Sequence, residues 1–212
     1  MILATALIGA LGVVALDSAG RNRRAVDARN IGEYMASFQS AALNYVADVN
    51  NNPAIIAAAK DGTGAAAVCV GNYVNSGTFD TLNNVTKKTC AVDASWLIFK
   101  GFLPPSFKLT NSLGQAPVAV YRLVYISGVP TTNIEMFVAG ASAVGTKTYP
   151  TARGFNLTQD AFTAANLMGT SMGVVPDNAA TPGCVWDPSV ATNRDACGTQ
   201  GAWKVRLSDF IN

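Results

Sequence analysis

The sequence predicts an α+β protein in which a long N-terminal α-helix packs on an antiparallel β-sheet headpiece. The chain opens with an apolar segment over residues 1–16 that continues directly into an amphipathic helical pattern. The later part contains short β-branched and aromatic runs, which are typical of strands. These runs do not alternate with helices in a βαβ order, so an antiparallel sheet is expected. We therefore expect an N-terminal helix over residues 1–52 and a globular α+β headpiece over residues 53–212.

The first half of the predicted helix, residues 1–20, is apolar. Its first sixteen residues read MILATALIGALGVVAL and carry no charged side chain. As a helix they are roughly 24 Å long, and a membrane-spanning helix needs about 20 apolar residues. No positive charge precedes this run, and the helical pattern continues through the following arginines. We therefore expect the segment to be retained in the mature protein and any basic leader to have been removed.

The second half, residues 21–52, is amphipathic. Apolar residues recur mostly every three or four positions, at Val26, Ile31, Tyr34, Met35, Phe38, Ala42, Tyr45 and Val49. The face from Ile31 onward is expected to pack on the protein's own sheet, and Asn50 to Pro53 should end the helix. A helix of residues 1–50 would be roughly 75 Å long, longer than the core of a 22.0 kDa globule. Its first half must then be buried in lipid or in other protein chains.

The headpiece elements follow in order. A short helix is predicted over residues 54–60, and a second over 94–100, which Asp93 is placed to cap. Gly101 and Pro104 should end that second helix. The runs 118–125 and 134–139, separated by a Gly-Val-Pro turn region, predict an antiparallel hairpin. A helix over residues 158–168 and a half-exposed strand over 201–207 complete the prediction.

The four cysteines are Cys69, Cys90, Cys184 and Cys197, and none of them forms a C-x-x-C pair. Three pairings are possible, and proximity along the chain favours Cys69–Cys90 and Cys184–Cys197. The alternative is four free thiols in a cytosolic protein. Because the chain also opens with a membrane-type segment, an exported protein with two disulfides is favoured.

Composition excludes several kinds of chemistry. The chain has no histidine, which removes histidine-based metal sites and Ser-His-Asp or Cys-His catalysis. The net charge is +2, with the basic residues spread thinly, so no nucleic acid partner is expected. P-loop and G-x-G-x-x-G motifs are absent. GTSMG at residues 169–173 has the G-x-S-x-G spacing, but without a histidine the chain cannot complete the triad that this motif serves. Asp187 and Asp195 are more typical of turns than of a cation site, and the tryptophans, including Trp96, more typical of packing than of glycan binding. We expect no enzyme activity, no cofactor and no metal.

Asp17 follows the apolar run, where a carboxylate near an apolar core requires a partner. Arg21 lies four positions further along the same helix face. We expect a core salt bridge between Asp17 and Arg21, Arg23 or Arg24, within one chain or between neighbours. For the arginines, contact with anionic lipid headgroups and a solvated helix face are equally open.

Three stretches carry a resemblance to a known family. They are WLIFKGFLPPSFKLTNSLGQ at residues 96–115, AANLMGTSMGVVP at residues 164–176, and GAWKVRLSDF at residues 201–210. Their GFLP, TN-x-x-GQ and GAW-x-x-x-L-x-x-F elements resemble the constant region of shufflon-type minor pilins and their type IVb relatives. Together with the apolar helix and the cysteine-bearing headpiece, they make the chain similar to a type IV pilin.

The resemblance implies the type IV pilin fold and a structural subunit of an extracellular pilus filament at the bacterial cell surface. Before assembly the subunit would sit in inner-membrane lipid with its headpiece outside. Its implied partners are the pilus assembly machinery and copies of itself, which polymerise through their N-terminal helices. The filament core would then contain Met1, Ile2, Leu3, Thr5, Leu7, Ile8, Leu11, Val13, Val14 and Leu16.

The chain departs from the family pattern in two ways. Thr5 stands where most type IV pilins carry a glutamate, which places the usual pairing of that glutamate with a neighbour's N-terminal amine in doubt. The chain also stops at Asn212 without the exchangeable adhesive domain of shufflon tip proteins, which favours a filament-building subunit. The alternatives are a minor pilin or pilus-tip adhesin that binds a surface ligand and, more remotely, a membrane-anchored exported enzyme.

Overall fold

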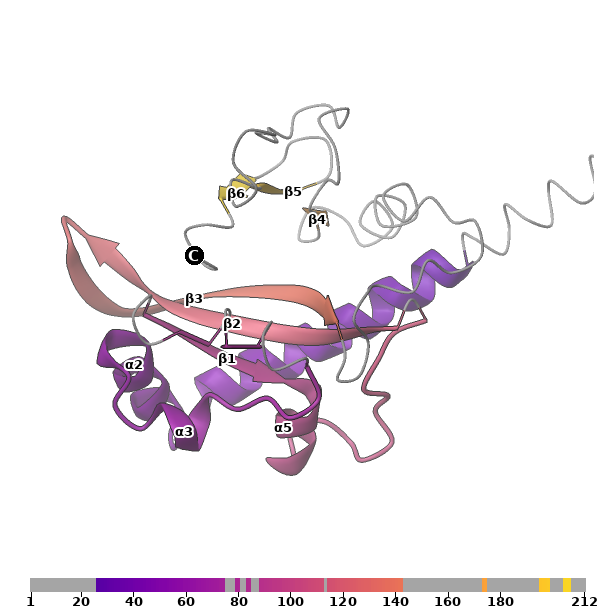
Figure 1. The fold of residues 1–212 in the computed structure, drawn as a ribbon, viewed down its shortest axis with the longest axis horizontal. Coiled ribbons are helices and arrows are strands. Elements are labelled where there is room, and N and C mark those ends of the chain that lie inside the picture. Colours follow the sequence, from indigo (N-terminus) through magenta and orange to yellow (C-terminus); the bar gives the residue numbers. More distant parts are fainter. Residues whose placement is uncertain are drawn as a thin grey trace, which may run out of the picture.

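The computed structural model describes residues 26–74, 79–80, 83–84, 88–112, 114–142, 173–174, 195–198 and 204–206. A long helix over residues 26–47 opens this part of the chain. Two short helices and a strand follow it, then another helix and the remaining strands (Figure 1). The elements are α2 (Asn52–Asp61), α3 (Ala65–Val68), β1 (Thr89–Asp93), α5 (Ala94–Phe99), β2 (Gln115–Ile126), β3 (Val129–Ser142), β4 (Gly173–Val174), β5 (Asp195–Gly198) and β6 (Lys204–Arg206). The α+β prediction is confirmed at this level.

The main sheet has three antiparallel strands in the order β1-β2-β3. β2 and β3 form the predicted hairpin, closed by the pair Ile126 and Val129. Its turn consists of Ser127 and Gly128, whose φ angles of 51° and 80° are both positive. Two-residue turns with this backbone match the right-handed twist of the strands they join. Of the predicted Gly-Val-Pro turn region, only Gly128 belongs to the turn, because β3 already begins at Val129.

Side chains of β2 alternate between two apolar clusters. Ala119, Tyr121 and Leu123 belong to the larger cluster, which also contains residues of the long helix, α2 and α5. Val118 and Val120 face the opposite side of the sheet and pack in a cluster with residues that include Phe79. The central strand is thus buried on both faces, and the larger cluster fixes the helices to one of them (Figure 1).

The long helix buries the predicted apolar face in most positions. Ile31, Phe38, Ala42 and Tyr45 are buried, as expected. The expectation for Val49 is wrong, because this side chain is 80% exposed. The helix ends at residue 47, and the Asp48 carboxylate then accepts hydrogen bonds from the backbone N–H groups of Asn50 and Asn51. Such local side-chain bonds compete with helix continuation, so Val49 lies in a turn.

Two short helices match their sequence signals. α5 begins after Asp93, whose carboxylate accepts a hydrogen bond from the backbone N–H of Trp96, as the predicted cap requires. Gly101 follows it with a φ of 79°, a conformation that glycine adopts at little cost. α2 carries Pro53 in its first turn and ends at Gly62 in the left-handed conformation. Both ends of α2 follow the usual preferences of helix termini.

Strand β1 was not predicted, and neighbouring segments cover its outer edge. The N–H of Thr89 donates to the carbonyl of Asn84, and the N–H of Asp93 donates to that of Val70. Between them, the N–H of Ala91 donates to the side-chain oxygen of Asn83. These bonds close this edge of the sheet to further strand pairing, which protects against edge-to-edge aggregation.

A second antiparallel sheet has the strand order β4-β5-β6. β6 lies inside the strand predicted over residues 201–207. Asp195, expected in a turn, instead begins β5 and lies opposite Arg206 of β6. The helix predicted over residues 158–168 lies outside the described residues.

Candidate assembly site on the long helix

The inner face of the long helix is fixed to the headpiece by polar contacts as well as by apolar packing. The Tyr121 hydroxyl of β2 donates a hydrogen bond of 2.8 Å to the carbonyl of Ala42. Nearer the N-terminal end, the Tyr34 ring stacks on Phe107 with centroids 4.8 Å apart, and its hydroxyl donates to the Lys108 carbonyl. These contacts anchor the helix to its own headpiece over about two turns.

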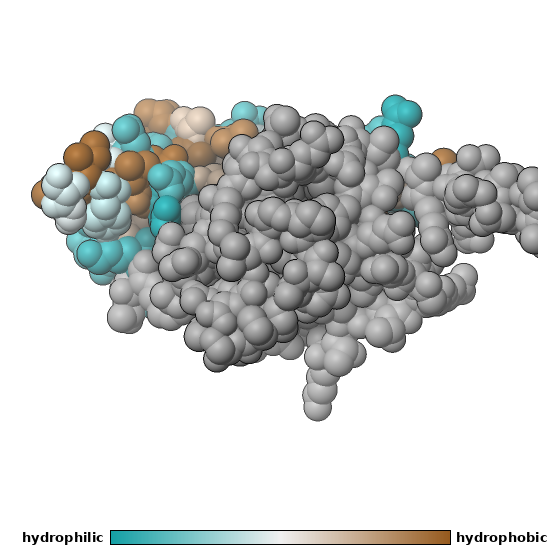
Figure 2. Space-filling model, turned by 90° about the horizontal axis from the view of Figure 1, so that it is seen from above, coloured by the Kyte–Doolittle hydropathy of each residue, from teal (hydrophilic) through white to brown (hydrophobic). Residues whose placement is uncertain are grey.

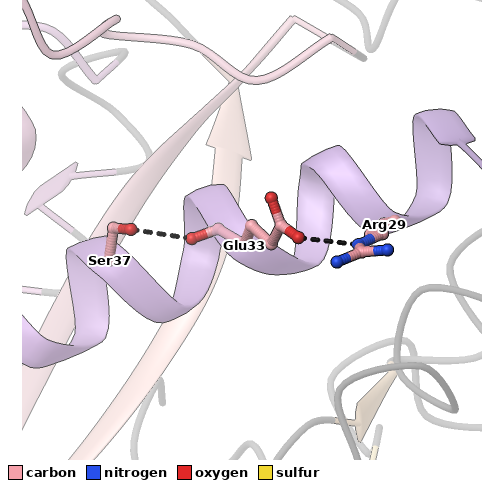
Figure 3. Close-up of polar contacts among 3 residues, drawn as sticks. All are labelled: Arg29, Glu33 and Ser37. Carbon is pink, nitrogen blue, oxygen red and sulfur yellow. Dashed lines mark hydrogen bonds and ion pairs between the residues drawn. The ribbon is translucent and has the colours of Figure 1, made fainter.

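The outer face of the helix is polar and exposed. Arg29 Nε donates to Glu33 Oε1 at 2.8 Å, and these side chains are 74% and 59% exposed. One turn further on, the Ser37 hydroxyl donates to the Glu33 carbonyl (Figure 3). An exposed ion pair of this spacing stabilises a helix by only about 0.3–0.5 kcal/mol. These residues keep the outer face hydrated, although Leu43 and Val26 on the same helix are also exposed apolar side chains.

A hydrogen-bonded group joins the C-terminal half of the helix to α3 and α5. The Tyr45 hydroxyl donates to the Val68 carbonyl at 2.8 Å and accepts a bond from Trp96 Nε1 at 3.0 Å. Trp96 therefore has the packing role that the sequence favoured. The hydroxyl of a buried tyrosine requires hydrogen-bond partners. The hydrogen bond between Tyr45 and Trp96 therefore helps to fix the position of the long helix relative to α5.

Asp93 organises the connection between β1, α5 and the preceding loop. Its side chain is fully buried and accepts four hydrogen bonds. Oδ1 accepts from the Ser95 hydroxyl and from the backbone N–H of Trp96, and Oδ2 accepts from the backbone N–H groups of Tyr73 and Val74. These four hydrogen bonds compensate for the removal of the Asp93 carboxylate from water.

The Cys69–Cys90 disulfide is formed, as the sequence predicted. It links the residue after α3 to the second residue of β1, and both cysteines are buried. Within the bridged loop, the Asn83 side-chain amide donates to the Cys69 carbonyl at 3.0 Å. The loop is thus closed covalently and by hydrogen bonds to the sheet. Cys197 lies in β5, while its predicted partner Cys184 lies outside the described residues.

Burial raises the pKa of three tyrosines. In Tyr34, Tyr45 and Tyr121 removal from water is the largest cause, because it disfavours the phenolate. For Tyr45 the hydrogen bond from Trp96 opposes this rise in pKa and the Asp48 charge adds to it. These hydroxyls are therefore structural donors at neutral pH.

Exposed apolar side chains also gather at the tip of the β2–β3 hairpin. Tyr125, Ile126 and Val129 are exposed there, and Lys88 Nζ lies 5.1 Å from the Tyr125 ring centroid. Figure 2 shows hydrophobic residues interspersed with hydrophilic ones at this end of the molecule. The tip is a small mixed surface rather than a continuous apolar patch.

The predicted filament-core residues between Met1 and Leu16 lie outside the described part of the chain, as do Asp17, Arg21, Arg23 and Arg24. Within the described residues, no group of three or more cysteine or acidic side chains is arranged to hold a metal. Among the same residues, no helix is both long enough and apolar enough to cross a membrane. The described part of the predicted assembly segment is therefore its amphipathic half.

Comparisons with protein-family models, with curated proteins and with solved structures found no match.

Proposed function

We propose that this protein is a structural subunit that polymerises through its apolar N-terminal helix into an extracellular type IV pilus. The observation that carries the proposal is the two-faced long helix together with its sequence context. One face of residues 26–47 is buried against the headpiece, and the opposite face is exposed. Its N-terminal continuation begins with sixteen residues without a charge. A helix anchored to a headpiece at one end and apolar at the other suits assembly through the apolar end.

The apolar segment has the composition needed for close helix packing. Lipid is as apolar as leucine, so helices that leave a membrane for a filament core gain little from hydrophobic burial. Their association depends on close approach, which small residues permit. The segment contains several small residues, at Ala4, Ala6, Gly9, Ala10 and Gly12. Repeated heterologous contacts between identical subunits that do not close into a ring produce a helical fibre.

The disulfide agrees with the proposed location. A buried Cys69–Cys90 bridge is typical of proteins that fold in an oxidising compartment such as the bacterial periplasm. Before assembly, the proposed subunit is held in the inner membrane with its headpiece on the periplasmic side. The assembly machinery then moves it into the filament at the cell surface.

The proposal is tested by shearing surface fibres from the producing bacterium and labelling them with an antibody to the headpiece. Electron microscopy should show dense labelling along the whole fibre, and deletion of the gene should remove the fibres. Sparse or tip-only labelling would instead identify a minor pilin or tip adhesin. Unlabelled fibres that persist after the deletion would contradict the proposal.

A further inference from the structure

The C-terminal end of α5 carries an exposed aromatic side chain. Phe99 is 75% exposed, the largest exposed fraction of any aromatic side chain in the described residues. Its ring stacks on that of Trp96, with centroids 5.3 Å apart and planes at 28°. Most of the Phe99 side chain is therefore open to water and accessible to a ligand.

A lysine completes this surface. Lys100 Nζ lies 4.8 Å from the Trp96 ring centroid and 6.0 Å from that of Phe99. Among the described residues its ammonium makes no ion pair with a carboxylate. We call Trp96, Phe99 and Lys100 the aromatic shelf. It offers one largely exposed ring and one cation that forms no ion pair with an acidic side chain of the described residues.

Hydrogen bonds to Trp96 hold the aromatic shelf in position on the headpiece. The indole nitrogen of Trp96 donates to the Tyr45 hydroxyl in the core, and its backbone N–H is capped by Asp93. Phe99 and Lys100 follow on the same short helix and its C-cap. A surface whose anchor is already ordered loses little conformational entropy on binding. This preorganisation suits a small ligand that makes few contacts.

The small area and the positive charge of the aromatic shelf indicate which kind of ligand it can bind. Stable protein interfaces bury about 800 Å² on each partner, which is far more than one phenyl ring provides. A single ring does match the apolar C–H face of one pyranose, whose slightly positive hydrogens are attracted to the negative face of an aromatic ring. The Lys100 ammonium, which lies over the Trp96 ring, adds a preference for a carboxylate. We propose that the aromatic shelf binds a uronic acid residue of an acidic polysaccharide, with the sugar ring on Phe99 and its carboxylate at Lys100.

Ligand-observed saturation-transfer NMR on the full chain in detergent micelles tests this proposal, with trigalacturonic acid as the probe. Maltotriose supplies the sugar rings without the charge, and triglutamate supplies the charge without the rings. We expect trigalacturonic acid to bind at least about tenfold more tightly than either of these. Phe99→Ala and Lys100→Gln should each weaken binding about tenfold.

Matched variants control for general effects. Ile126→Ala removes an exposed apolar side chain from the hairpin tip, and Lys60→Gln removes an exposed charge from α2. Both should leave binding within about twofold of the wild type. Equal binding of triglutamate, undiminished binding by Phe99→Ala, or no binding of trigalacturonic acid would each overturn the proposal. Self-association in sedimentation that Phe99→Ala abolishes would assign the shelf to a second copy instead.

This test is independent of the proposed polymerisation. The subunit is assayed as a dispersed chain, so failure to form fibres leaves the expected binding unchanged. Conversely, Phe99→Ala fibres of normal abundance combined with lost sugar binding would separate the two activities.

Discussion

The indole nitrogen of Trp96 donates a 3.0 Å hydrogen bond to the hydroxyl of Tyr45, fifty-one residues earlier in the chain. Tyr45 lies on the inner face of the long helix, and Trp96 lies on α5 after the first strand. Because the same hydroxyl donates to the Val68 carbonyl, one oxygen atom connects the helix, the segment before the disulfide and α5. Four predictions about the stability of the protein depend on this connection and on other buried contacts of the headpiece.

Tyr45→Phe should reduce the free energy of unfolding by about 1–3 kcal/mol, because it leaves the Trp96 N–H and the Val68 carbonyl without their partner. Urea unfolding of the full chain in mild detergent measures this change. Tyr34→Phe is the matched control, since its hydroxyl has one partner, the Lys108 carbonyl, in a more exposed setting. A loss for Tyr45→Phe no larger than for Tyr34→Phe would show that the connection contributes little.

Asp93→Asn should also destabilise the protein, by about 2 kcal/mol or more, because an amide offers one acceptor oxygen where the carboxylate offers two. The N–H groups of α5 and of the Tyr73–Val74 segment compete for that oxygen. Asp80→Asn changes an exposed carboxylate and should be nearly neutral. Equal unfolding midpoints for Asp93→Asn and the wild type would argue against the role given to Asp93.

Replacing both Cys69 and Cys90 by alanine should lower stability by about 3 kcal/mol, according to the loop-entropy estimate for a loop of this length. The cysteines are 3% and 0% exposed, so the native bridge should resist a mild reductant until denaturant is added. Mass spectrometry after alkylation measures the reduced fraction. Peptide mapping of the oxidised protein tests the predicted Cys184–Cys197 pair at the same time, and a crossed pairing would contradict the local-loop argument.

Stability should fall at high pH. The pKa values of Tyr34, Tyr45 and Tyr121 are raised in the folded state, chiefly by burial. Their contribution to stability is therefore complete below the usual tyrosine pKa of about 10 and is lost as the pH rises above it. Absorbance at the tyrosinate band during a pH titration should show these phenols ionising only as the protein unfolds. Tyr121→Phe should flatten the alkaline decline, and early ionisation of all six tyrosines would contradict this view.

The elements that the sequence predicted correctly are those with a local signal. Asp93 three residues before Trp96 is sufficient to predict the start of α5, and the β-branched runs on either side of Gly128 are sufficient to predict the hairpin. The helical period predicted the buried face from Ile31 to Tyr45. Each of these features depends on residues that are close together in the chain.

The features that were missed depend on contacts between distant residues or on competition for hydrogen bonds. β1 is short and buried in every position, so it lacks the alternation that marks a half-exposed strand. Its edge is completed by Asn83 and Val70, which no local pattern connects to it. Val49 fitted the helical period, but the Asp48 carboxylate bonded the next backbone groups and ended the helix first. No periodic pattern in the sequence predicts the aromatic shelf, because it depends on the exposure of Phe99 in the folded protein.

Asp17→Lys should block fibre assembly while leaving the headpiece folded. In the proposed filament this carboxylate lies beside the apolar core, where it requires a basic partner among Arg21, Arg23 and Arg24. A lysine at this position would repel those arginines. Asp80→Lys introduces the same charge change at an exposed headpiece position and should assemble normally. Sheared-fibre yield and the tryptophan fluorescence of the headpiece separate assembly from folding. Normal fibres from Asp17→Lys would contradict this account of the core.

The central claim is that residues 1–16 form the core of a filament built from copies of this chain. Cryo-electron microscopy of the sheared fibres tests it most directly, because the reconstruction traces each subunit through the core. We predict one helix from the apolar segment through residue 47, with residues 1–16 at the filament axis in contact with the same segment of neighbouring copies. A fibre whose axis is built from another segment or another protein, with residues 1–16 at its surface or absent, would contradict the account.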